Sequence, residues 1–154
     1  MNSSVRAYRD SDRASVMSLV DRFTSFDLPP WRDKQTVDDA NRNALSAALD
    51  ALHAGRAVFV AERNNTFAGF VHVCVKSDHF THEDIGYVSD IVVHPDFEGV
   101  GVAGELLDAT LQWAQELDLK VLTLEVFDGN TRAMRLYEKH GYARDVVQYT
   151  RPVD

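Results

Sequence analysis

Residues 86–104 have the sequence GYVSDIVVHPDFEGVGVAG, an apolar run followed by a proline and three closely spaced glycines. The run from Gly86 to Val93 is rich in β-branched residues and predicts a central strand, which His94 and Pro95 end. Apolar residues then recur at helical spacing and predict an amphipathic helix of about four turns. Its apolar stripe consists of Ala103, Leu106, Leu107, Thr110, Trp113, Ala114 and Leu117. The chain therefore passes from strand to helix at a glycine-rich turn.

The rest of the chain also alternates predicted strands and helices. Strands are expected at residues 5–8, 57–61, 67–75, 121–127 and 143–150, and helices at 12–23, 36–55 and 130–140. Thr36 is the expected cap of the second helix, whose apolar stripe is Val37, Ala40, Ala44, Ala48 and Leu52. Period-two alternation places Phe67, Gly69, Val71, Val73 and Val75 on one strand face. With 154 residues, 45% of them hydrophobic, residues 1–154 are expected to form one α/β domain.

The charge and composition of the sequence limit which molecules the protein is expected to bind. The formal net charge is −8, which disfavours nucleic acid because its phosphates would be repelled. The same charge favours cationic substrates, or serves solubility alone. No apolar run approaches the roughly 20 residues that span a bilayer, so no membrane contact is expected. The polar start of the chain is unlike a signal peptide, and the single Cys74 fits a reducing, cytoplasmic setting.

The glycine turn predicts a phosphate site. Glycines allow backbone N–H groups to approach a ligand closely, and a helix that starts there adds the positive end of its dipole. Gly99, Gly101 and Gly104 also match the dinucleotide-binding pattern G-x-G-x-x-G, with Glu125 at the position of its acid. Residues 94–98 separate the glycines from the strand, however, and the chain after Gly104 is too short for the further βα units of that fold. A glycine turn without a ligand is the third interpretation.

The wider stretch resembles the GCN5-related N-acetyltransferase (GNAT) family. That family follows a strand and a proline with arginine or glutamine, then x-x-Gly-x-Gly/Ala, and the corresponding residues here are 98–103, EGVGVA. Its next motif appears as Asn130, Ala133, Tyr137, Gly141 and Tyr142. The resemblance implies a mixed, mostly antiparallel central sheet flanked by helices, and acetyl-CoA as acetyl donor. Glu98 departs from the basic or amide residue of the motif, and we expect its side chain to turn to solvent.

The resemblance also implies site residues. The backbone of Ile91, Val92 and Val93 would run beside the pantetheine and acetyl group, with an N–H near Val92 or Val93 on the acetyl carbonyl. The amides of Gly99, Val100, Gly101, Val102, Ala103 and Gly104 would hold the diphosphate, and Asn130 the pantetheine arm. Tyr137 would donate to the departing sulfur. Glu125, 12 positions before Tyr137, is the candidate base or amine-binding group, and it is expected among apolar neighbours on a strand. Asp90, Glu83 or a water molecule are the alternatives.

The function that follows is direct acetyl transfer in a ternary complex from acetyl-CoA to a primary amine. The acceptor is either a small cationic amine or a peptide or protein amine. The alternative is a catalytically silent acyl-CoA-binding sensor or interaction module, which Glu98 favours. No metal is expected, because His79-x-x-His82-Glu83 falls in a predicted loop without a second ligand motif. The oligomeric state is left open between a monomer and a homodimer.

Overall fold

Five strands form one sheet in the computed structural model, which describes residues 2–153 and so leaves Met1 and Asp154 of the expected domain outside. The strands are β1 (Ser3–Ala7), β2 (Arg56–Arg63), β3 (Thr66–Ser77), β4 (Asp84–Val93) and β5 (Leu122–Leu124), in that spatial order. Pairing is antiparallel from β1 to β4 and parallel between β4 and β5. The predicted mixed, mostly antiparallel sheet is confirmed.

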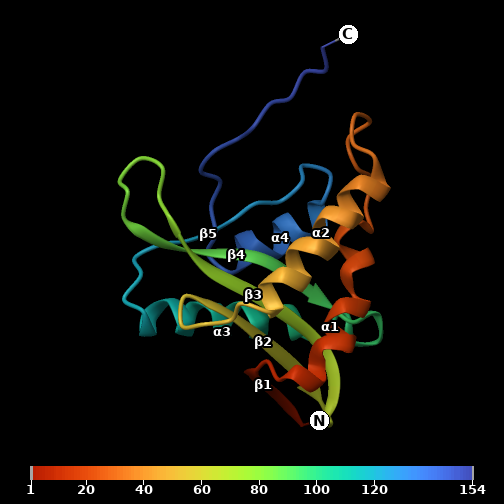
Figure 1. The fold of residues 1–154 in the computed structure, drawn as a ribbon, viewed down its shortest axis with the longest axis vertical. Coiled ribbons are helices and arrows are strands. Elements are labelled where there is room, and N and C mark those ends of the chain that lie inside the picture. The colour runs from red at the N-terminus through yellow and green to blue at the C-terminus, as the bar shows by residue number, and fades with distance from the viewer. Residues whose placement is uncertain (1, 154) are drawn as a thin grey trace.

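Helices cover both faces of the sheet (Figure 1). One face carries α1 (Arg13–Ser18), the short helix η2 (Val20–Thr24) and α2 (Lys34–Leu49), packed around Val16, Val20, Leu45, Val60 and Phe70. The other face carries α3 (Val102–Glu116), whose Val102, Leu106 and Trp113 meet Val71 and Val88 of the sheet. The helix α4 (Thr131–Lys139) follows β5, and short 3-10 turns stand at Asp10–Asp12 (η1) and Pro95–Phe97 (η3). Among residues 2–153, no helix is long and apolar enough to cross a membrane.

The β2–β3 hairpin shows how a bulge changes a face. Asn64 and Asn65 have φ values of 50° and 63°, the left-handed conformation that tight hairpin turns require. A register irregularity then follows between Ala61 and Glu62. Because of it, Phe67 packs against the cluster on the α1–α2 face, while Val71 and Val73 face α3. The expectation that Phe67 shares their face is wrong, since a bulge inverts the alternation.

The second helix also differs from its prediction. Its cap is Asp33, whose carboxylate accepts from the Thr36 backbone N–H at 2.9 Å, so Thr36 lies inside the first turn. The buried stripe contains Leu45, Ala48 and Leu49, whereas Ala40 and Ala44 are exposed. Alanine is a strong helix former on either face, so its spacing did not reveal the buried side. The expected helix 12–23 is divided into α1 and the 3-10 turn η2.

Two predicted strands are shortened or missing beside β4. The predicted strand 121–127 pairs only over Leu122–Leu124, and the Phe127 ring instead packs 5.5 Å from the Phe26 ring. Residues 143–150 form no strand, are exposed, and extend away from the sheet (Figure 1). A three-residue β5 offers little edge for another strand to join. The consequence is that β4 is paired on its β5 side only at residues 86–88 of the described chain.

Candidate active site

A cavity of about 470 Å³ opens where β4 and the segment after β5 separate. It is lined by β4 residues 88–93, by residues 124–127, by the glycine turn and by one side of α4. Its volume lies within the ordinary range of small-molecule sites. The cavity brings together most of the residues singled out from the sequence.

The glycine turn supplies open backbone at one end of this cavity. Gly99 and Gly101 have φ values of +76° and +88°, and a Cβ built on either would meet no atom within 4 Å. Gly101 is also the N-cap residue of α3, so the first N–H groups of that helix lie beside the open space. Such a cradle fits a phosphate group. Of the residues expected there, Val100 is 49% exposed and does not line the cavity.

The remaining turn residues have packing roles as well. Val102 lines the cavity, but its side chain is buried in the core between the sheet and α3. Ala103 and Gly104 also line the cavity. A Cβ on Gly104 would lie 2.9 Å from Nε2 of His140, so glycine here allows α3 and the end of α4 to approach each other.

The free edge of β4 presents main-chain groups to the cavity. The His94 N–H donates to the Ala68 carbonyl of β3 at 2.8 Å. Because successive N–H groups of a strand point to opposite edges, the Val93 N–H points away from β3, toward the separated β5 side. Ile91, Val92 and Val93 all line the cavity, although the Val92 side chain is buried in the core.

Asn130 and Tyr137 come from α4, which forms one wall. The Asn130 side chain accepts from the Ala133 N–H at 3.3 Å and caps the helix, as predicted, and both Asn130 and Tyr137 line the cavity. Burial, with Tyr142 close by, raises the pKa of the Tyr137 phenol from 10.0 to about 12. The phenol therefore keeps its proton at neutral pH and is a hydrogen-bond donor.

A part-buried chain of polar contacts joins Arg56 of β2, His72 of β3 and Asp90 of β4. His72 on β3 is 3% exposed, and its Nδ1 lies 2.9 Å from a carboxylate oxygen of Asp90. Its Nε2 lies 3.0 Å from the Arg56 guanidinium, which can only donate. Nε2 must therefore accept, and Nδ1 carries the proton that it donates to Asp90. His72 and Asp90 are direct cross-strand partners in the β3–β4 register, so their side chains lie on the same face of the sheet.

Glu125 occupies a different environment from the one expected. β5 ends at Leu124, and Glu125 is exposed at the cavity wall instead of lying among apolar strand neighbours. The pKa of the Tyr87 phenol is raised to about 12. Burial is the main cause, and the negative charges of Glu125 and Asp90 add to it. Glu83 is exposed in the turn before β4 and does not line the cavity.

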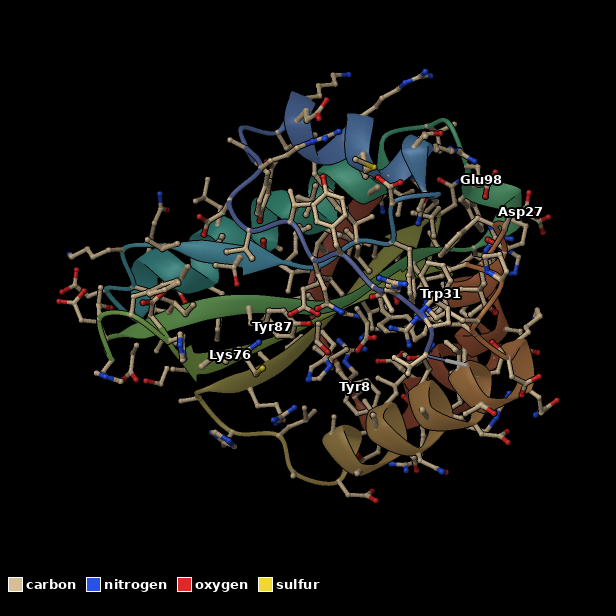
Figure 2. The ribbon with its side chains drawn as sticks, turned by 90° about the horizontal axis from the view of Figure 1, so that it is seen from above. Tyr8, Asp27, Trp31, Lys76, Tyr87 and Glu98 are labelled. Carbon is tan, nitrogen blue, oxygen red and sulfur yellow. The ribbon has the colours of Figure 1, made fainter. Side chains whose placement is uncertain are left out.

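Glu98 is held by two arginines, which corrects the expectation that its side chain turns to solvent. One carboxylate oxygen pairs with Arg22 of η2, and the other accepts from Arg132 of α4 at 3.1 Å. These contacts lower the pKa of the Glu98 carboxyl, and the hydrogen bond from Arg132 has the largest effect. Figure 2 shows Glu98 at the opposite side of the view from Lys76 and Tyr87, whose ammonium and ring are 3.9 Å apart.

Sequence reasoning missed Arg22, Arg132, His72 and Arg56 as parts of this region. Arg132 carried a usable signal, because a cation in the first turn of a helix opposes the helix dipole. The other contacts join separate elements, so only the fold reveals them. Within residues 2–153, no three His, Cys, Asp or Glu side chains are grouped to hold a metal ion.

Comparison with known proteins gives this arrangement a family. The acetyltransferase (GNAT) family matches residues 16–142. The chain is 28% identical over 141 residues to the Bacillus subtilis protein "Uncharacterized N-acetyltransferase YhfO", covering 92% of this chain and 90% of that one. It is 27% identical over 141 residues to "L-amino acid N-acyltransferase MnaT" of Escherichia coli, covering 90% and 78%. The structure of "Aminoglycoside N-Acetyltransferase AAC(6')-Iy in Complex with CoA" superposes with a TM-score of 0.74 at 19% identity, covering 98% and 95%.

The strand separation, the glycine cradle and α4 define an acyl-CoA-dependent acetyltransferase fold. The chain belongs to the acetyltransferase (GNAT) family and is an acetyl-CoA-dependent N-acetyltransferase. The residues present fit the donor substrate, since open main-chain donors at Gly99–Gly101 suit a diphosphate and the free edge of β4 suits an extended amide-containing arm.

Proposed function

We propose that the chain transfers the acetyl group of acetyl-CoA directly to a primary amine bound in the same cavity, without an acyl-enzyme. The supporting observation is the unequal charge of the cavity. Its described cationic lining residues, Arg22 and Arg132, meet at the glycine turn, where they outnumber the one carboxylate of Glu98. Asp90 and Glu125 line other parts of the cavity. A phosphate-bearing donor fits the turn, and a cationic acceptor fits the two carboxylates.

The acceptor is a small cationic amine or a peptide or protein amine. Asp90 is suited to binding an ammonium group, because it lines the cavity and the hydrogen bond from His72 holds its carboxylate in place. Glu125 is exposed in the cavity wall and is suited to accept the proton of the attacking nitrogen, directly or through water. The amine must lose that proton, since only the neutral form attacks and a lysine-like amine has a pKa near 10.4.

The reaction then balances as follows. The amine nitrogen attacks the thioester carbonyl carbon, and the oxyanion is stabilised by the Val93 N–H at the free edge of β4. As the C–S bond breaks, the Tyr137 phenol donates to the sulfur. The ammonium acceptor loses one proton, through Glu125 or water, to become the attacking amine. The nitrogen loses a second proton after the attack, and this loss balances the proton gained by sulfur, so the products are an amide, the thiol of CoA and one released proton. Cys74, the one cysteine of the sequence, is buried and does not line the cavity, which supports direct transfer.

A catalytically silent acyl-CoA-binding module is the second candidate. The observation that favoured it was Glu98 in the phosphate-binding motif. Pairing of Glu98 with Arg22 and Arg132 offsets its negative charge, so this residue gives no reason for loss of cofactor binding or turnover.

Initial-rate kinetics test the proposal. Free thiol release would be followed with acetyl-CoA and a panel of primary amines that includes amino acids, polyamines, an aminoglycoside and a lysine peptide. We expect release with at least one primary amine, none with its N,N-dimethyl analogue, and intersecting double-reciprocal lines. Parallel lines would contradict direct transfer, and CoA binding without release on any amine would favour the silent module.

A further inference from the structure

The inference concerns the three charged residues at the mouth of the glycine turn: Glu98, Arg22 and Arg132. The two arginines come from η2 and α4, elements far apart in the sequence, and both reach the same carboxylate. All three line the cavity that contains the glycine turn. At this position the Glu98 carboxylate pairs with both guanidinium groups, next to the expected site of the diphosphate.

The cavity offers little other positive charge for its ligand. Among the described residues that line the cavity, Arg22 and Arg132 are the only lysines or arginines. CoA, in contrast, carries a diphosphate and a 3′-phosphate. Glu98 stands at the motif position where the resembled family has a basic or amide side chain. The positive charge that this position lacks is present on the neighbouring elements.

Two features make Arg132 available to an incoming anion. Arg132 lies in the first turn of α4, after the cap residue Asn130, where the helix dipole favours anions. Its side chain is 74% exposed, and an ion pair of that exposure is weak and exchanges readily. Arg22 and Glu98 are less exposed, at 30% and 33%, so their pair fixes the direction of the Arg22 side chain.

We propose that Glu98 is an internal stand-in for a phosphate of CoA, and that Arg22 and Arg132 exchange its carboxylate for that phosphate when CoA binds. In the free enzyme the Glu98 carboxylate thereby holds both guanidinium groups beside the turn and offsets one of their two positive charges. On binding, each arginine gains a phosphate oxygen and Glu98 is released toward solvent. The proposal rests on the proposed function, because it concerns the donor end of the same cavity.

Calorimetric titration of the full chain with CoA and with 3′-dephospho-CoA tests this exchange. Arg22→Ala and Arg132→Ala would each weaken CoA binding about 10-fold, as loss of a charge-assisted hydrogen bond does. Arg135→Ala is the matched control, since Arg135 is exposed on the same helix and does not line the cavity. Its Kd would stay within about twofold of the parent value.

The direction in which Glu98→Gln changes the affinity for CoA decides the question. Exchange predicts that this variant binds CoA about threefold more tightly, because the carboxylate no longer competes for the arginines. A loss of affinity with Glu98→Gln, or arginine variants that bind CoA like the control, would overturn the proposal. If the arginine effect disappears with 3′-dephospho-CoA, the exchanged group is the 3′-phosphate; if it persists, the group is the diphosphate. No CoA binding by the parent chain would instead refute the proposed function, and ligand-free melting curves separate misfolding from lost contacts.

Discussion

Alanine in place of Gly101 separates a ligand-binding role of the glycine turn from a purely conformational one. Gly101 has φ +88°, and Gly141 at the end of α4 has φ +87°; a Cβ at either position meets nothing within 4 Å. The left-handed conformation costs alanine about 1–2 kcal/mol, so both Gly101→Ala and Gly141→Ala lose similar stability. For a chain of this size the melting temperature falls by about 2–8 °C in each case.

Only Gly101→Ala affects binding if phosphate oxygens lie against the turn. Its new methyl group would occupy the space that the ligand needs, whereas Gly141 does not line the cavity. We expect the Kd for CoA to rise at least about 10-fold in Gly101→Ala, equal to about 1.4 kcal/mol, and to stay within about twofold in Gly141→Ala. Isothermal titration calorimetry measures both values. Equal Kd values for the two variants would refute the cradle.

Three further changes test the other groups. Tyr137→Phe should lower kcat for thiol release about 10²-fold without raising the Kd for CoA, and an unchanged kcat would remove the phenol from the reaction. Asp90→Asn should raise KM for a cationic acceptor about 10-fold or more, as truncation of a charge pair does, whereas the exposed Asp96→Asn serves as control; equal KM values would exclude Asp90 from acceptor binding. Burial raises the pKa of Tyr87 and Tyr137 above the unfolded value of 10.0, so both phenols contribute to the free energy of unfolding. In chemical denaturation this contribution should be complete below pH 10 and should be lost as the pH rises through about 12. A smaller loss in Tyr137→Phe is expected, and an identical profile would contradict the assignment.

The sequence was most informative where local geometry requires one residue type. Gly99 and Gly101 need positive φ, and Asn130 needs a side chain that can cap a helix, so their spacing predicted both the turn and α4. The strand from Gly86 to Val93 was predicted almost to its ends, because β-branched residues dominate it.

Predictions failed where tertiary contacts decided the outcome. The strand ending at Phe127 was too long, because the Phe127 ring packs on Phe26 from another loop. Alternation along β3 failed at Phe67, where a bulge in the pairing inverted the face. The pairing of Glu98 with Arg22 and Arg132 could not be predicted, because it depends on the meeting of three elements.

A crystal structure with bound acetyl-CoA tests the central claim most directly. The account predicts diphosphate oxygens within hydrogen-bonding distance of the main-chain N–H groups around Gly101. It also predicts the thioester between β4 and the end of β5, with its sulfur in reach of the Tyr137 hydroxyl. Density for acetyl-CoA at any other surface, or a sulfur turned away from Tyr137, would contradict it.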